Sequence, residues 1–258
     1  MAFELSASVI IVLIPASPDA IAAISMARNA SHVAHLSVRK GWRPQQVLLW
    51  DFDVQPKDLG RGLTFGSDSK KCDIQLPSGI VTTRHFSINF NPSSGILLVI
   101  NNSSHGLVAG KRHLGNRGAS QVIEHGMTIV YNDYKFIAYF KERGRSQQLY
   151  DERLRSYLGF LLTGSPARVM STHSTPLVVR ERIGSYLEIA KLGKGGFGEV
   201  ALLTHERTGD VFAAKSIRKE RHNAAEIEKE ISTLKRLRHV RILAFPLVHA
   251  VEVQVLTR

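Results

Sequence analysis

Residues 193–200 read Gly193-Lys194-Gly195-Gly196-Phe197-Gly198-Glu199-Val200. Glycines let a backbone approach a phosphate group closely and turn its N–H groups toward it. A G-x-G-x-x-G pattern by itself is a weak indication, because it also occurs in mobile loops and in dinucleotide-binding turns. The dinucleotide-binding turn requires a helix directly after the last glycine. Here strand-like segments flank the loop, at 186–190 and 200–203, so the sequence predicts a glycine loop at the tip of a β-hairpin.

A third strand is expected at 211–217, after the turn Thr208-Gly209-Asp210, and it carries Ala213-Ala214-Lys215. A lysine buried without a partner in an apolar strand is costly. A phosphate-bearing ligand together with an acidic partner would account for Lys215. The alternative is an edge lysine whose ammonium group reaches water.

A helix is expected from about residue 224 to residue 238. Glu230 lies inside its apolar stripe, which is formed by Ile227, Ile231, Leu234 and Leu237. This position predicts a carboxylate that points inward and pairs with Lys215. The alternative is a boundary glutamate that pairs with Lys235 or Arg236 on the surface.

Taken together, residues 183–243 resemble the N-lobe of a Ser/Thr protein kinase. The resemblance implies that the glycine loop covers ATP phosphates, that Val200 and Ala213 sandwich the adenine, and that Glu230 orients Lys215 on the α- and β-phosphates. The implied cofactor is ATP, with Mg in the intact family. The implied nucleotide-binding residues are Gly193, Lys194, Gly195, Gly196, Phe197, Gly198, Val200, Ala213 and Lys215.

The catalytic motifs of that family do not occur in the 258 residues. Phosphoryl transfer requires the Asp and Asn of the catalytic loop and the metal-binding Asp of Asp-Phe-Gly. Neither His-Arg-Asp nor Asp-Phe-Gly is present. We therefore expect no catalytic residue and no metal ligand in this chain, weak ATP binding, and no phosphoryl transfer. Whether the sequence is a truncated gene model stays open.

Upstream, residues 33–140 alternate short apolar runs with turn residues, which predicts a β-sandwich. Strands are expected at 47–50, 62–66, 86–90, 96–100, 127–131 and 136–140. Within 86–90, phenylalanine and isoleucine alternate with Ser87 and Asn89. This alternation predicts one buried face and one face in water.

Residues 63–110 resemble a forkhead-associated (FHA) domain, a sandwich whose apical loops bind phosphothreonine. The matching pieces are Thr64-Phe65-Gly66, Cys72-Asp73-Ile74-Gln75-Leu76, Thr82-Thr83-Arg84-His85 and Ser103-Ser104-His105-Gly106. The resemblance implies that His85 braces the loops and that Thr82 offers a hydroxyl to the phosphate.

Two positions depart from the FHA pattern. Ser67 replaces the phosphate-contacting Arg, and His105 replaces the Asn that holds the peptide backbone. Lys70, Lys71 or Arg84 could supply the missing cation. The implied phosphopeptide-binding residues are Ser67, Thr82, Arg84, His85 and His105, and the alternative is a degenerate FHA sandwich used for docking.

The remaining segments are less regular. Residues 1–32 form a poorly defined N-terminal segment, in which the apolar run 9–14 is expected to be a strand or a packed segment, and 16–31 to be loosely ordered. The run is too short to span a membrane, and no positive charge precedes it as in a signal peptide. Residues 141–182 are interpreted as a linker with a short helix around 150–162, and 183–258 as a truncated kinase N-lobe.

Composition limits the possible functions. Lys and Arg number 34 against 22 Asp and Glu, which gives a net charge of +12. No run of five basic residues occurs, so this surplus argues only weakly for nucleic acid. The single cysteine, Cys72, excludes an intramolecular disulfide and a cysteine-rich zinc site and fits a reducing compartment.

The sequence thus predicts a multi-domain, β-rich α+β protein, in which an FHA-like sandwich precedes a kinase N-lobe of antiparallel strands and one helix. An FHA domain directly before a Ser/Thr kinase resembles the DNA-damage checkpoint kinases. That resemblance implies phosphothreonine-containing partners, ATP and a nuclear or cytoplasmic location, without membrane. The alternative is a non-catalytic phosphopeptide- or protein-binding FHA module with a vestigial kinase fragment.

Overall fold

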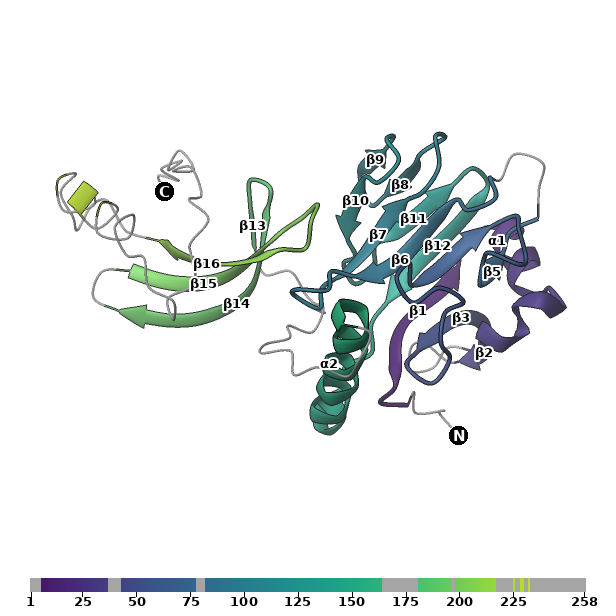
Figure 1. Cartoon of the computed structure of the whole chain (residues 1–258), viewed down its shortest axis with the longest axis horizontal. Coiled ribbons are helices and arrows are strands. Elements are labelled where there is room, and N and C mark those ends of the chain that lie inside the picture. The colour runs from purple at the N-terminus through teal and green to yellow at the C-terminus, as the bar shows by residue number, and fades with distance from the viewer. Residues whose placement is uncertain are drawn as a thin grey trace. The chain divides into compact units, whose positions relative to one another are not determined.

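The computed structural model describes residues 6–36, 43–77, 82–163, 181–195 and 198–216, together with Ala225, Glu228, Lys229 and Ser232. The chain divides into two compact units. The first unit comprises residues 1–189 and 204–211, and the second comprises 190–203 and 212–258. Figure 1 shows the strands and helices of both.

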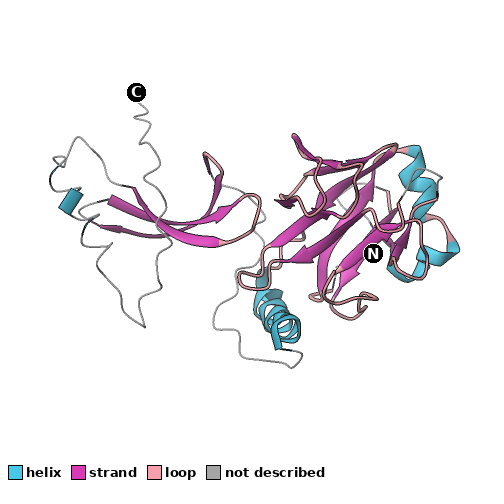
Figure 2. Cartoon of the chain, turned by 45° about the horizontal axis from the view of Figure 1, so that its top comes forward, coloured by secondary structure: helices cyan, strands magenta, loops and turns pink. Residues whose placement is uncertain are grey.

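Two sheets form a β-sandwich in the first unit (Figure 2). The seven-stranded sheet has the order β2(Val33–Leu36), β3(Gln45–Asp51), β1(Val9–Pro15), β12(Tyr134–Tyr139), β11(Thr128–Tyr131), β8(Leu107–Ala109) and β9(Arg112–Leu114). The five-stranded sheet has the order β10(Ser120–Val122), β7(Leu97–Asn101), β6(Phe86–Phe90), β4(Leu63–Gly66) and β5(Ile74–Gln75). The pairing of β4 with β5 is parallel, whereas β6 pairs antiparallel with both β4 and β7. The predicted β-sandwich is confirmed.

The core between the sheets is rich in aromatic side chains. The rings of Phe65 and Phe86 stack with their centroids 4.2 Å apart, and Phe136 packs against Phe65 from the opposite sheet. Each of these side chains is buried. Buried aromatic rings contribute large apolar areas, so this cluster is a main source of the sandwich's stability.

The prediction that one face of β6 is exposed to solvent is wrong, because both polar residues of the strand are buried. The Asn89 side-chain amide donates to the Gly60 carbonyl oxygen at 2.9 Å. The Ser87 hydroxyl accepts from the Asn102 side-chain amide at 3.0 Å. Loops therefore cover this face, and their hydrogen bonds offset the cost of burying the polar groups.

The N-terminal segment is part of the sandwich. Strand β1 lies between β3 and β12 and pairs antiparallel with both, as expected for the apolar run. The expectation that residues 16–31 are loosely ordered is wrong, because they form α1(Pro18–Ile24) and the 3-10 helix η1(Ala27–His32). The Ser17 hydroxyl caps α1 by accepting from the Ala20 N–H, and the helix buries Ala20, Ala23 and Ile24.

The helix predicted around 150–162 is confirmed as α2(Gln147–Thr163), which follows the short 3-10 helix η2(Gly144–Ser146). It buries Tyr150, Leu154 and Leu158, spaced four residues apart on one face. Tyr157 packs edge-on against Trp50 of β3. Helix α2 therefore belongs to the hydrophobic core of the sandwich.

A separate four-stranded antiparallel sheet forms the C-terminal part, in the order β13(Glu181–Ile183), β14(Tyr186–Gly195), β15(Gly198–His205) and β16(Val211–Ser216). The predicted strands on both sides of the glycine loop are confirmed. The helix predicted over 224–238 lies mainly outside the described residues; the four described residues in it are helical. Among the described helices, none has the length and apolar character needed to cross a membrane.

Candidate functional site

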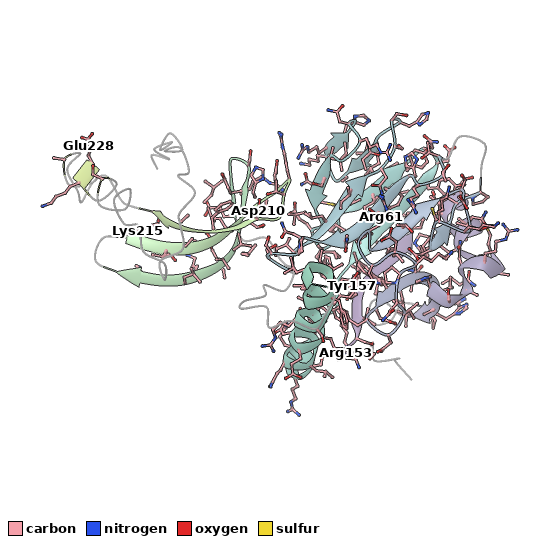
Figure 3. All side chains as sticks on the ribbon, viewed as in Figure 1. Arg61, Arg153, Tyr157, Asp210, Lys215 and Glu228 are labelled. Atoms are coloured by element: carbon pink, nitrogen blue, oxygen red, sulfur yellow. The ribbon has the colours of Figure 1, made fainter. Side chains whose placement is uncertain are left out.

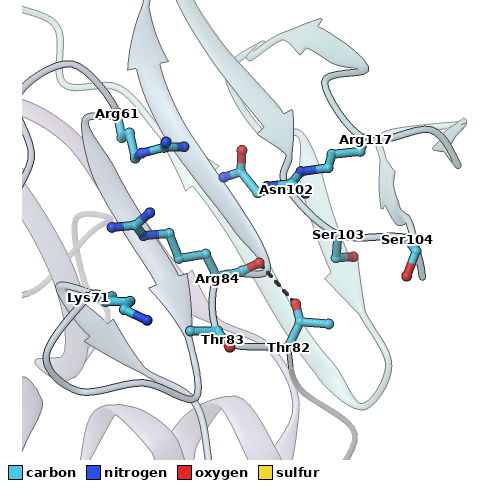
Figure 4. Close-up of a pocket in the computed structure, with 9 residues that line it drawn as sticks. All are labelled: Arg61, Lys71, Thr82, Thr83, Arg84, Asn102, Ser103, Ser104 and Arg117. Atoms are coloured by element: carbon cyan, nitrogen blue, oxygen red, sulfur yellow. Dashed lines mark hydrogen bonds between the residues drawn. The ribbon is translucent and has the colours of Figure 1, made fainter.

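A cavity of about 490 Å³ opens on the sandwich at the loops beside β4, β6 and β7 (Figure 4). Its lining contains four cationic side chains, hydroxyl groups and one amide, and no carboxylate. The lining residues are Arg61, Lys71, Thr82, Thr83, Arg84, Asn102, Ser103, Ser104 and Arg117. This composition favours an anion that accepts several hydrogen bonds.

Gly66 allows the two loops around this cavity to meet. A β-carbon at this position would lie 2.4 Å from the Thr83 carbonyl oxygen and 2.9 Å from the Arg84 Cα. Only glycine fits there, because real β-carbons do not approach backbone atoms so closely. The end of β4 thus holds the backbone that presents Thr82 and Arg84 to the cavity.

The cations differ in their present partners. Arg61 forms an exposed ion pair with Asp58 at 3.1 Å, and Lys71 forms one with Asp68 at 3.4 Å. Within the described residues, the Arg84 Nε atom is buried and has no hydrogen-bond partner. A buried donor without a partner is unfavourable, so Arg84 is the cation best placed to gain from an incoming anion.

His85 connects the loops behind the cavity. Its Nδ1 lies 3.1 Å from the Thr82 hydroxyl, and its Nε2 lies 3.2 Å from the Gly106 carbonyl oxygen and 3.0 Å from the Ser103 hydroxyl. The Thr82 hydroxyl donates to the Arg84 carbonyl oxygen at 2.9 Å, and a neutral His85 ring with its proton on Nε2 donates to the Gly106 carbonyl oxygen. Burial lowers the pKa of His85 from 6.5 to about 4, so this neutral form is the one present at pH 7.

The lowered pKa of His85 predicts a loss of stability in mild acid. Between pH 6.5 and pH 4 the unfolded chain binds a proton at this residue and the folded protein does not. The contribution of His85 to the free energy of unfolding is therefore fully present above pH 6.5 and is lost as the pH drops toward 4. Between pH 7 and pH 5 this loss is about 2 kcal/mol. Urea unfolding at pH 7 and at pH 5 measures this loss of stability. His85→Gln should remove this part of the pH dependence, and an unchanged slope would contradict the assignment.

The residues implied by the FHA resemblance fall in two groups. Thr82 and Arg84 line the cavity, whereas Ser67, His85 and His105 do not. Ser67 lies beside it, donating its backbone N–H to the Thr82 carbonyl oxygen at 3.1 Å, and His105 is exposed.

Of the candidate replacement cations, Lys71 and Arg84 line the cavity and Lys70 does not. Sequence reasoning missed Arg61 and Arg117. Both lie in turns outside the matching motif pieces, Arg61 shortly before the first and Arg117 after the last. The neighbouring glycines, Gly60 and Gly118, indicate that each arginine lies in a turn. They do not indicate that the two arginine side chains line a common cavity.

In the second unit, the glycine loop joins β14 and β15, with Gly195 ending one strand and Gly198 beginning the next. A β-carbon at Gly193 would meet nothing within 4 Å. Gly198 has φ +150, which a residue with a side chain rarely adopts. Lys191 and Glu199 pair across the two strands at 2.6 Å. The ion pair thus joins the two strands beside the loop, and there is open space beside Gly193.

Strand β16 places Ala213 and Lys215 on one exposed face, because side chains two residues apart in a strand share a face. Figure 3 shows Lys215 on this strand. Val200 on β15 is half-buried. Of the residues implied for an ATP site, Gly193, Val200, Ala213 and Lys215 thus lie on β14, β15 and β16. Gly196, Phe197 and Glu230 lie outside the described residues, so the pairing of Lys215 with Glu230 stays a prediction.

Comparison with family models agrees with both parts of the chain. The FHA domain model matches residues 60–130, and the protein kinase domain model matches residues 186–253. The chain therefore contains an FHA domain followed by part of a protein kinase domain.

Curated relatives match through the kinase segment. The "Sucrose non-fermenting protein kinase 1" of Fusarium virguliforme is 40% identical over 67 residues, covering 24% of this chain and 10% of that protein. The "Carbon catabolite-derepressing protein kinase" of Candida glabrata is 37% identical over 78 residues, covering 29% of this chain and 13% of that protein. The chain thus matches only about a tenth of each relative's length.

Two solved structures are similar at a lower level. A crystal structure of Rad53 with AMP-PNP has a TM-score of 0.41 at 20% identity, covering 72% of this chain and 45% of that one. The MEK1 FHA domain with a HOP1 phosphothreonine peptide has a TM-score of 0.29 at 15% identity, covering 38% of this chain and 91% of that one. Neither likeness is close enough to support a functional conclusion.

Proposed function

We propose that this protein reads phosphothreonine through its FHA domain, and that it is a member of the FHA-type Ser/Thr kinases related to the checkpoint kinases. The observation that carries the first part is the cavity lined by Arg84, three further cations and several hydroxyl groups, in which the Arg84 Nε is buried and has no hydrogen-bond partner among the described residues. A phosphate group supplies both the charge and the acceptors that these donors require.

Arg84 takes the role of the arginine that the FHA pattern places at position 67. Its guanidinium would form charge-assisted hydrogen bonds to the phosphate, while the hydroxyl groups of Thr82 and Ser103 stand on either side of His85, which holds them at 3.1 Å and 3.0 Å. Arg61, Lys71 and Arg117 at the rim add long-range attraction for an anionic peptide. In this proposal, Arg84, in the loop that precedes β6, offsets the loss of the usual arginine.

The test is a titration with a pool of phosphothreonine peptides of varied flanking sequence, measured beside the same pool without phosphate. We expect binding of the phosphorylated pool alone, weakened by rising salt because the rim cations are exposed. Equal binding of both pools, or none at high micromolar concentration, would leave the FHA domain as a docking or structural module.

For the kinase segment, we propose that residues 193–200, Ala213 and Lys215 form the ATP-binding half of a kinase domain, and that the 258-residue polypeptide does not itself transfer phosphate. Bound ATP with Mg supplies the transferable phosphoryl group in intact kinases. Here the glycine backbone would lie along the phosphates and Lys215 would neutralise part of their charge. No cluster of three or more potential metal-ligating side chains occurs among the described residues.

Lys215→Ala should weaken the already weak binding of a fluorescent ATP analogue by about tenfold, since one ammonium–phosphate contact contributes about 1.5 kcal/mol. The matched control is Lys229→Ala, an exposed lysine outside the proposed nucleotide-binding set. Incubation with radioactive ATP and Mg should show no phosphorylation above that of the Lys215→Ala variant. Metal-dependent transfer above this level would refute the proposal of an inactive polypeptide.

A second candidate is a non-catalytic FHA module that carries a vestigial kinase fragment. The absence of His-Arg-Asp and Asp-Phe-Gly from the 258 residues favours it for this polypeptide. Under both candidates we propose nuclear or cytoplasmic phosphothreonine proteins as partners. Sequencing the transcript distinguishes them, because a transcript that encodes both motifs identifies a catalytic kinase.

A further inference from the structure

The turn between β15 and β16 forms specific hydrogen bonds with a loop of the FHA sandwich, and both lie in the first compact unit. The Asn91 side-chain amide donates to the Thr208 carbonyl oxygen at 2.7 Å and to Asp210 Oδ1 at 3.0 Å. The Ser94 hydroxyl donates to the Gly209 carbonyl oxygen at 2.7 Å. Figure 3 labels Asp210 in this turn.

The loop that makes these contacts is organised in advance. Asn91 Oδ1 accepts from the backbone N–H groups of Ser93 and Ser94, at 2.9 and 3.0 Å, which leaves its amide group directed at the turn. Asn91 is 8% exposed and Ser94 is 5% exposed. Polar side chains buried to this degree need partners, and the β15–β16 turn supplies them.

Gly209 fits closely against the same loop. It has φ +73, and a β-carbon there would lie 3.2 Å from Leu98 Cδ2 and 3.3 Å from the Asn91 Cβ. A side chain at this position would therefore both strain the backbone and press on the sandwich.

A second contact extends the edge of the five-stranded sheet. The Val122 backbone N–H on edge strand β10 donates to the Glu206 carbonyl oxygen at 2.7 Å, and the Ser120 hydroxyl donates to the Arg207 carbonyl oxygen at 2.6 Å. Edge strands expose donors and acceptors that another segment can pair with. Here the β15–β16 turn takes that place.

Apolar and charged groups complete the contact. Leu187 of β14 is fully buried with Ile96, Leu98 and Val122 of the sandwich. Arg182 of β13 pairs with Glu124 of the FHA domain at 2.8 Å and also with Glu206. Hydrogen bonds, an apolar cluster and ion pairs thus coincide on one surface.

We propose that this surface of the FHA domain, formed by Asn91, Ser94, Leu98, Val122 and Glu124, is a docking site for the kinase segment of the same chain. Its occupant is the pair of segments 182–187 and 204–211. These segments begin β14 and end β15, the two strands that carry the glycine loop at their other ends. The docking surface shares no residue with the lining of the Arg84 cavity.

Amide hydrogen exchange of the full chain, read residue by residue by NMR, tests the docking. In the wild type, the Val122 amide should exchange at least about tenfold more slowly than an unstructured amide, because its partner is Glu206. Gly209→Val should remove that protection and speed exchange in 204–211. Residues of β4 and β6 should keep wild-type rates, which shows that the sandwich remains folded.

The matched control is Gly144→Val, in η2, outside both docked segments. Gly144 also has positive φ, +48, but its β-carbon would meet nothing within 4 Å. We expect it to leave the Val122 amide protected. Should Gly209→Val disturb β4 and β6 as well, Ser94→Ala gives the milder version of the test. A Val122 amide that exchanges freely in the wild type, or at the wild-type rate in both Gly209→Val and Ser94→Ala, would overturn the proposal.

Discussion

Replacing Arg84 by alanine is expected to weaken binding of phosphothreonine peptides by about 10- to 100-fold, since charge-assisted hydrogen bonds contribute about 1.5–3 kcal/mol. Arg84 lines the cavity and is half-buried, so water screens its charge less than the charges of the three exposed cations. Its Nε has no hydrogen-bond partner among the described residues, so a phosphate would satisfy a donor that is otherwise unsatisfied. Isothermal titration of each variant with the tightest peptide of the pool measures the loss.

Two further variants separate geometry from charge. Arg84→Lys keeps the charge but not the planar fork of donors, so it should recover only part of the affinity. Arg28→Ala removes an arginine that hydrogen-bonds Gln75 outside the cavity, at 2.8 Å, and should leave the affinity unchanged. Equal losses in Arg84→Ala and Arg28→Ala would mean that the net positive charge, and not this cavity, attracts the peptide.

Replacing Trp50 by alanine is expected to lower the free energy of unfolding by about 3–5 kcal/mol, the range for truncating large buried aromatic residues. Trp50 is 1% exposed and packs against Phe90 of the opposite sheet and Tyr157 of α2, with ring centroids 5.6 and 6.1 Å away. Its loss would leave a cavity where three elements meet. Chemical denaturation followed by circular dichroism measures the change.

Two control variants test whether the size and the burial of the Trp50 side chain account for the loss of stability. Trp50→Phe should cost much less than the alanine variant, because it keeps a ring and removes a buried N–H that has no hydrogen-bond partner within the described residues. Phe160→Ala truncates an aromatic residue of α2 that is 47% exposed, and it should change stability by less than about 0.5 kcal/mol. A Trp50→Ala variant as stable as Phe160→Ala would show that α2 does not pack on the sandwich.

The longer strands could be predicted from the sequence because each is an apolar run bounded by turn residues. The strands β5, β8, β9 and β10 were not predictable in this way, since each has only two or three residues and no periodicity. Their positions depend on pairing with longer neighbours. The burial of Ser87 and Asn89 could likewise not be predicted from the sequence, because it depends on loops distant in sequence that cover β6.

The candidate sites divide in the same way. Thr82, Arg84 and Lys71 lie within or beside the FHA-like motif pieces, so the resemblance to FHA domains implied a role for Thr82 and offered Arg84 and Lys71 as replacement cations. Arg61 and Arg117 reach the same cavity from turns more than 50 residues apart in sequence, and no local pattern connects them. The pairing of Lys215 with Glu230 remains a prediction.

The sequence by itself determined the β-hairpin around the glycine loop, because short-range periodicity and glycine spacing encode local backbone conformation. The order of the two domains followed from the resemblance of their motifs to known families. The sequence also determined that the catalytic motifs are missing from these 258 residues. Only the tertiary structure decided which cations meet at the cavity of the FHA domain and that Asn91 and Ser94 hold the β15–β16 turn. Both depend on contacts between distant segments, whose strength comes from burial and from partners that a linear pattern does not specify.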